Sequence, residues 1–108
     1  MAYQHQELAA GRWNELSLMA QLANTGSEVE RAIKWKQKAN PAYSEQAFFR
    51  ALELLDLTLQ DPKNRTRLRE IARTREALVD YFQGENLYHS SDLLWQKYFF
   101  AFNVVARR

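Results

Sequence analysis

The fold is decided by residues 12–38, RWNELSLMAQLANTGSEVERAIKWKQK, in which small or apolar residues recur at steps of four, four, three and four. That spacing places them on one continuous face of an α-helix. The stripe keeps its phase across residues 24–27 (NTGS), so we expect one long helix from Arg12 to Lys38 with Gly26 on its packed face; two shorter helices are the alternative. The residues of the stripe are Leu18, Leu22, Gly26, Val29 and Ile33.

The second helical segment covers residues 42–60, whose apolar stripe is broad enough to contact more than one neighbouring helix. Two starts satisfy the capping rules equally well. Ser44 can act as the N-cap, or Asn40 can do so with Pro41 at the first helical position. The Asp-Pro pair at residues 61–62 ends the segment.

The third segment follows Asn64, a possible N-cap, and ends at Gly84, where we expect a left-handed C-terminal residue. Its apolar face includes Arg75. Because a guanidinium in an apolar environment needs an acceptor, we expect Arg75 to form a buried structural ion pair.

The fourth segment begins after Ser90 or Ser91 and continues to Ala106. Apolar side chains cover nearly its whole circumference, which is typical of a helix that packs against its own bundle and also against a partner. Trp95 and Phe99 belong to the face that we expect in the core, so the remaining apolar residues predict a partner surface. The candidate residues of that surface are Leu93, Tyr98, Phe100 and Val104.

Length and composition favour a single all-α domain. The chain has 108 residues, the usual size of one domain, and only three Gly and two Pro, too few for the turns of a many-stranded sheet. We therefore predict an antiparallel four-helix bundle with a long first helix, forming one domain over residues 1–108. The absence of Cys, of an apolar leader in residues 1–10 and of a run of about 18 apolar residues favours a cytoplasmic protein that does not span a membrane.

The third segment also contains a cluster of arginines. Residues 63–108 hold nine Lys or Arg against five Asp or Glu, whereas residues 1–62 hold six against eight. Arg65, Arg69 and Arg73 are spaced by four residues, which places them on one cationic edge able to contact successive phosphates or an acidic partner. We favour local neutralisation of this edge by nearby acidic residues, which would make the arginines structural surface. Those residues are Glu70, Glu76 and Asp80.

No catalytic, metal-binding or cofactor-binding pattern emerges from the sequence. The two histidines, His5 and His89, are far apart, and neither stands in a helical His-x-x-x-His or Glu-x-x-His arrangement. Three dispersed glycines cannot form a phosphate-binding loop, and no serine nucleophile elbow is present. We therefore expect a protein that uses no cofactor and is not an enzyme.

The layout resembles HEPN-type helical bundles, with a long first helix, an Ala- and Leu-rich second helix from Ser44 to Leu59 and two further amphipathic helices. The resemblance covers most of the chain and implies dimerisation through helices and partnership with another protein or with RNA. Ribonucleases of that family carry an Arg-x4-6-His motif. Neither His5 nor His89 has an arginine at that spacing, so no catalytic residue is carried over.

Together these patterns predict a non-enzymatic interaction protein that self-associates as a homodimer or docks a protein partner through its aromatic fourth helix. The alternative is an RNA-binding or nuclease-related bundle that uses the arginine edge of the third helix. The two differ in their response to salt, because phosphate contacts weaken steeply as salt rises and apolar contacts do not.

Overall fold

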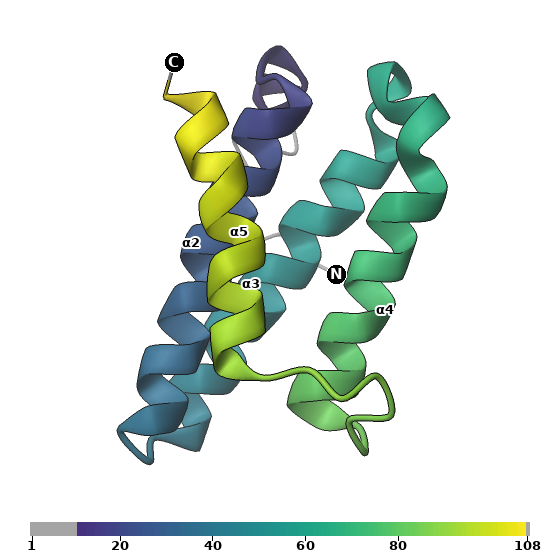
Figure 1. The fold of residues 1–108 in the computed structure, drawn as a ribbon. Coiled ribbons are helices and arrows are strands. Elements are labelled where there is room, and N and C mark those ends of the chain that lie inside the picture. Colours follow the sequence, from purple (N-terminus) through teal and green to yellow (C-terminus); the bar gives the residue numbers. More distant parts are fainter. Residues whose placement is uncertain (1–10, 108) are drawn as a thin grey trace.

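A computed structural model describes residues 11–107, and every regular element within that range is helical. Four α-helices form a bundle in which consecutive helices run in opposite directions, with two short 3-10 helices at one end (Figure 1). This architecture confirms the all-α four-helix bundle. The elements are η1 (Arg12–Glu15), α2 (Leu18–Gln37), α3 (Pro41–Gln60), η2 (Pro62–Arg67), α4 (Leu68–Gln83) and α5 (Asp92–Ala106).

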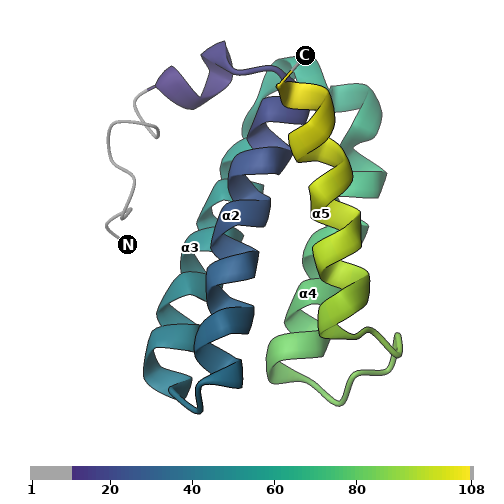
Figure 2. The same ribbon diagram turned by 60° about the vertical axis from the view of Figure 1, so that its left-hand side comes forward.

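The helix α2 packs against both α3 and α5, while α4 packs against α3 (Figures 1 and 2). Buried apolar side chains from all four helices meet in one core. Within it the rings of Phe48 on α3 and Phe82 on α4 lie with their centroids 5.0 Å apart. The hydroxyl groups of Thr74 and Tyr98 share a 2.9 Å hydrogen bond that joins α4 to α5.

Side-chain caps set the starts of three helices. Ser17 and Ser91 each accept a hydrogen bond from the backbone amide three residues later, and Asn40 does the same at the start of α3. The start with Asn40 as N-cap and Pro41 in the first turn is therefore the observed one. Ser44 instead donates its hydroxyl to a backbone carbonyl of α2 at 2.8 Å, which ties α3 to α2.

The first helix is continuous through residues 24–27, as expected, but it is shorter than expected. It begins at Leu18 and not at Arg12, because the preceding residues form η1 and Leu16 has an extended backbone with ψ of 146°. Trp13 accounts for the break. Its side chain is buried against α3, and η1 reaches that site by turning away from the axis of α2.

Two expectations for the third helix are wrong. Gly84 ends α4 with φ of −105°, which is not left-handed, and positive φ values occur instead at Asn86 and His89. The side chain of Asn86 holds this loop by hydrogen bonds to the backbone of Ser90 at 2.8 and 2.9 Å. Asn64 is not the N-cap of α4, because it lies buried within η2.

A buried polar cluster joins η1, α2, α3 and η2. Gln21 donates from Nε2 to Asp61 Oδ2 at 2.8 Å and to the Trp13 carbonyl at 3.0 Å. Its Oε1 accepts from Asn64 Nδ2 at 2.9 Å, and the Trp13 indole donates to Thr58 Oγ1 at 3.0 Å. Buried polar groups are costly unless they are hydrogen-bonded, and these side chains satisfy one another.

Gly26 is buried where α5 packs on α2, which confirms its placement on the packed face. A Cβ atom added at Gly26 would lie 2.5 Å from Phe99 Cβ, closer than two carbon atoms approach without a shift. The missing side chain therefore allows Phe99, and α5 with it, to lie directly against the backbone of α2.

Arg75 has the expected carboxylate partner but is not buried. Its Nε donates to Asp56 Oδ1 on α3 at 2.8 Å, and 34% of the Arg75 side chain is exposed. The ion pair therefore joins α4 to α3 at the surface, where salt and water screen it.

Candidate interaction surfaces

The helix α5 presents opposite faces to the bundle and to the surroundings. Trp95 and Phe99 are buried in the core, whereas Leu93, Phe100 and Val104 are exposed by 41 to 64%. The exposure of these three residues follows from helix geometry. Each residue is rotated by about 100° from the previous one, which places these three on the side away from the buried pair. Three of the four candidate partner residues are therefore accessible.

Tyr98, the fourth candidate, belongs to the contact between α5 and α4 instead. It is partly buried, its hydroxyl is hydrogen-bonded to Thr74, and its ring packs edge-on against Phe99 with centroids 5.0 Å apart. The position of α4 was needed to place it, because the apolar pattern of α5 alone does not show which side α4 covers.

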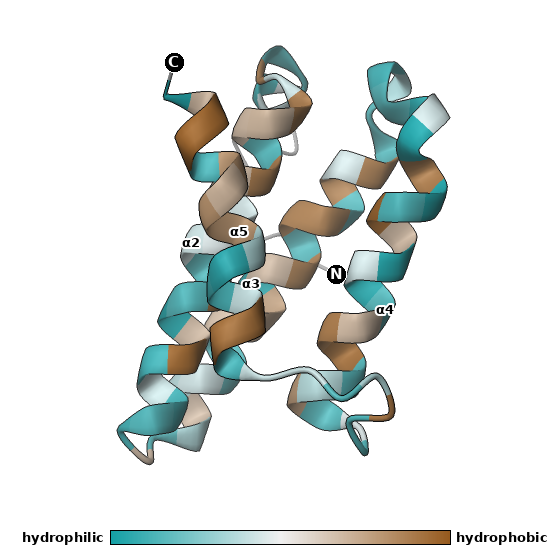
Figure 3. Ribbon diagram, viewed as in Figure 1, coloured by the Kyte–Doolittle hydropathy of each residue, from teal (hydrophilic) through white to brown (hydrophobic). Residues whose placement is uncertain are grey.

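Two further apolar residues, Leu94 and Val105, are exposed on α5 although the sequence pattern did not single them out. In Figure 3, the side of α5 that faces the viewer has the brown colour of hydrophobic residues near both ends of the helix. Lys97 is the charged residue that interrupts this side. We use the term outward face of α5 for the exposed large apolar residues of this helix. They are Leu93, Leu94, Phe100, Val104 and Val105.

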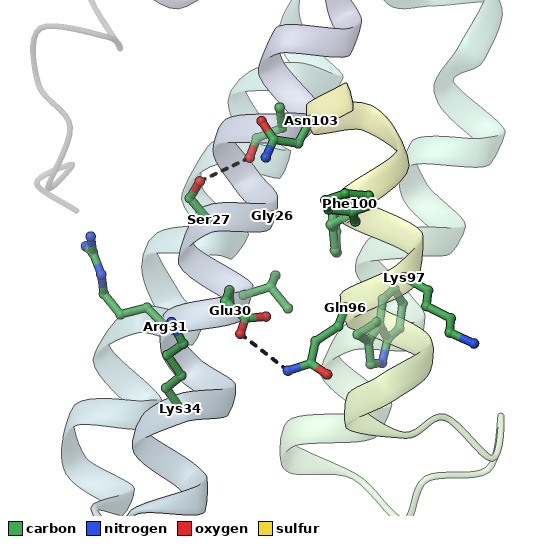
Figure 4. A pocket seen from close by; sticks show the side chains of 13 residues that line it. Gly26, Ser27, Glu30, Arg31, Lys34, Gln96, Lys97, Phe100 and Asn103 are labelled. Carbon is green, nitrogen blue, oxygen red and sulfur yellow. Dashed lines mark hydrogen bonds between the residues drawn. The ribbon is translucent and has the colours of Figure 1, made fainter. Parts of the chain in front are cut away.

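A groove of about 630 Å³ lies beside the outward face, between α5 and α2 (Figure 4). Phe99 and Phe100 contribute apolar lining, and Gly26, against which Phe99 lies, contributes backbone. Glu30 on α2 accepts a 3.3 Å hydrogen bond from Gln96 on α5 across the groove (Figure 4). The sequence reasoning missed this groove, because its two walls are about 66 residues apart in the chain and no local pattern aligns them.

The expected arginine edge is divided between two elements. Arg65 lies in η2, whereas Arg69 and Arg73 lie one turn apart on α4. All three side chains are exposed. Within residues 11–107 none of the three forms an ion pair.

The acidic residues near this edge interact elsewhere. Glu70 pairs with Arg67 at 2.8 Å, and Asp80 accepts hydrogen bonds from two backbone amides of the loop before α5. Glu76 interacts with the Tyr88 hydroxyl, and its negative charge raises the pKa of Tyr88. The expected local neutralisation therefore does not take the form of ion pairs, and Arg65, Arg69 and Arg73 keep their charges accessible.

The start of α5 is anchored by Asp92, which accepts a 2.9 Å hydrogen bond from Lys36 Nζ and a second one from the Tyr81 hydroxyl. Burial raises the pKa of Asp92, but these hydrogen bonds outweigh it, so the net pKa lies below the ordinary value. The pKa values of Lys36 and Tyr81 are both raised. Both groups are therefore protonated near pH 7 and do not act as bases, so the cluster is an anchor between α2, α4 and α5.

Among the described residues, no three His, Cys, Asp or Glu side chains lie close enough together to hold a metal ion. His89 is exposed in the loop before α5, and His5 lies outside the described residues. None of the helices in the described part of the chain has the length and apolar character needed to cross a membrane.

No protein-family model, curated protein or solved structure matches this chain. The resemblance to HEPN-type bundles therefore stays a prediction.

Proposed function

We propose that this chain is a non-enzymatic interaction protein that forms a homodimer through the outward face of α5. The observation that carries the proposal is the exposure of Phe100, at 64%, within a set of exposed apolar side chains that only Lys97 interrupts. Burying such a side chain is worth roughly 1.5–3 kcal/mol. Because the largest apolar patch on a protein surface, typically about 300–600 Å², often marks a binding site, a partner is the expected cover.

A second copy is the partner that fits this face most simply, because a two-fold axis lets one surface cover an identical one. Leu93, Lys97, Phe100 and Val104 follow one another at steps of four, three and four, the spacing of the seam between two paired helices. In an antiparallel pair centred between Lys97 and Phe100, Leu93 of each copy meets Val104 of the other. The aliphatic stem of Lys97 then covers Phe100 while its ammonium group stays in water.

The proposal includes a cytoplasmic location, which fits a chain without cysteine. It includes no cofactor and no reaction.

Sedimentation velocity over a concentration series tests the dimer. We expect the parent to dimerise and Phe100→Glu to raise the dissociation constant by roughly tenfold or more, because a carboxylate replaces a buried ring. Phe49→Glu is the matched control, since Phe49 is also an exposed phenylalanine but lies on α3. A parent that stays monomeric at high concentration contradicts the proposal.

A second candidate function is RNA binding. It is favoured because the acidic residues near the arginines interact with other groups. With Glu70 paired to Arg67 and Asp80 bound to loop amides, Arg69 and Arg73 remain available to phosphates. Their Cα atoms are about 6 Å apart along α4, because four residues rise 1.5 Å each. Two copies in a dimer would present two such surfaces and raise the avidity for one RNA strand.

Fluorescence anisotropy with a labelled single-stranded RNA tests this candidate. If the surface binds RNA, changing Arg65, Arg69 and Arg73 together to Gln weakens binding and lowers the salt slope by about one per lost phosphate contact. The matched control carries the same loss of charge elsewhere. Its substitutions are Arg12→Gln, Lys38→Gln and Arg107→Gln, at exposed positions that do not line the groove beside α5. Equal losses in both triple variants would indicate a non-specific charge effect and contradict an arginine-specific site.

A further inference from the structure

The area of the outward face of α5 sets a limit on what this helix can do alone. Each of its partly exposed side chains adds roughly 100 Å² to an interface, about half of what a large side chain buries in full, so the face supplies on the order of 500 Å² per protomer. A stable specific interface needs about 800 Å² from each partner. A second element must therefore contribute to the proposed dimer.

Two elements flank α5, and their charges differ. On α4, Arg69 and Arg73 are exposed and form no ion pair within the described residues. A two-fold axis that brings two α4 helices together would place these like charges near one another, which is unfavourable. This repulsion argues against α4 as the second element.

The α2 flank carries charges of both signs at the groove, Glu30 as well as Arg31 and Lys34, and Lys97 of α5 also lines it. Arg31 is paired with Glu28 at 3.3 Å and projects away from α5 (Figure 4). Glu30 is hydrogen-bonded to Gln96. Lys34 lies one turn further along α2, toward the end of the groove (Figure 4). Val29, Trp95 and Phe99 supply the apolar part of the lining, which suits an uncharged side chain.

Phe100 stands next to this groove and projects from α5 toward α2 (Figure 4). A knob and a groove on the same side of the molecule are what a two-fold interface requires, because each copy then offers a knob to the groove of the other. Phe100 is the most exposed of the apolar residues on α5, so it is the side chain best placed to serve as the knob.

Resting on the proposed homodimer, we infer that Phe100 of each copy enters the groove between α2 and α5 of the other copy. Each protomer then contributes α2 as well as α5 to the interface. The groove supplies the area that α5 lacks, and Phe99, which lies directly against Gly26, forms part of the apolar lining that the incoming ring contacts.

Filling the groove from α2 tests the inference without altering α5. Ser27 is exposed, lines the groove and hydrogen-bonds only the carbonyl of Ala23 on its own helix, so Ser27→Trp is expected to fold. We expect it to raise the dimer dissociation constant by roughly tenfold or more in sedimentation velocity. Gln46→Trp, at an exposed position of α3 that does not line the groove, is expected to change it by less than about twofold. Should Ser27→Trp fail to fold by circular dichroism, Ser27→Leu is the smaller filling variant.

The outcomes separate this inference from the homodimer on which it rests. A dimeric parent that Phe100→Glu disrupts and Ser27→Trp weakens supports both. A dimer disrupted by Phe100→Glu but unchanged by Ser27→Trp keeps the homodimer and overturns the role of the groove. A parent that stays monomeric at high concentration overturns both.

Discussion

Polar side chains lie inside the molecule where η1 and η2 meet α2 and α3, whereas large apolar side chains lie outside it along α5. In the first region Gln21, Thr58 and Asn64 are almost fully buried, and each is hydrogen-bonded. In the second, the side chains of Phe100 and Leu93 are more than half exposed, so no other described residue covers them. Both regions depart from the simple rule of apolar inside and polar outside.

The contrast shows that burial must be considered together with hydrogen bonding. The polar cluster is complete within one chain, because its donors and acceptors satisfy one another. The outward face of α5 is not covered within its own chain. Its burial against another surface would lower the free energy of the protein. We therefore expect mutations in the first region to change folding, and mutations in the second to change association.

The largest expected effect is at Trp13, in the polar region. Trp13→Ala removes a buried ring from its contacts with α3 and the indole hydrogen bond to Thr58, so we expect a loss of about 3–5 kcal/mol in the free energy of unfolding. Urea denaturation measures it. Leu93→Ala on α5 is the control, with an expected loss within about 0.5 kcal/mol at low protein concentration. If the two variants lost similar amounts of free energy of unfolding, the two regions would not differ in their effect on folding.

The next effect is at Gly26, on the inner side of α5. Gly26→Leu forces a side chain into space that Phe99 occupies, and we expect overpacking to cost about 1–3 kcal/mol. Thermal unfolding in dilute protein, where the proposed dimer is dissociated, measures it, and Ser27→Leu at the next, exposed position is the control. A Gly26→Leu variant that melts like the parent would contradict the close approach of α5 to α2.

The comparison also shows what the sequence could predict. The stripe through Gly26 is a local pattern that predicted a continuous helix, although not its start, and Asn40 and Ser91 were each one of the two starts that local capping rules allowed. The sequence also predicted three residues of the exposed side of α5, Leu93, Phe100 and Val104, but not Leu94 and Val105.

The rest depends on contacts between distant parts of the chain. Trp13 and Thr58 are 45 residues apart, so no local signal separates η1 from α2 or removes Asn64 from the cap of α4. Arg75 was expected to be buried, but the ion pair that it forms with Asp56 of α3 is partly exposed. Tyr98 was assigned to the exposed surface because the position of α4 cannot be read from the sequence of α5.

A smaller effect is expected at Asp61, which is buried in the polar cluster. Burial raises the pKa of Asp61, but hydrogen bonds from Lys63 and Gln21 outweigh it, so the pKa in the folded protein lies below the ordinary value of 3.8. A depressed pKa stabilises the fold above pH 3.8, and this stabilisation is lost as the pH falls through the folded-state pKa. We expect Asp61→Asn to cost about 1 kcal/mol at neutral pH.

Urea denaturation of parent and Asp61→Asn across the acidic range measures this pH dependence. The difference between the two proteins is expected to shrink as the pH falls from 3.8 through the lower pKa of the folded protein, because Asp61 of the parent becomes neutral over that range. Asp56→Asn is the control, since it removes a carboxylate from a surface ion pair and is expected to cost less. A difference between parent and Asp61→Asn that is constant from neutral to acidic pH would contradict the depressed pKa.

The smallest expected effect on folding is at Phe100, although this residue has the largest expected effect on association. Because Phe100 is 64% exposed in one copy, replacing it with Ser removes few contacts within the chain, and the free energy of unfolding should change by less than about 0.5 kcal/mol in dilute protein.

At higher concentration the parent gains stability from dimerisation by mass action, whereas Phe100→Ser does not. The parent Tm should therefore rise with protein concentration while the variant Tm stays constant. Differential scanning calorimetry over a concentration range of about 100-fold measures both. Equal concentration dependence in the two proteins would place the interface elsewhere, and a large loss of stability in dilute Phe100→Ser would mean that this ring supports the fold of its own chain.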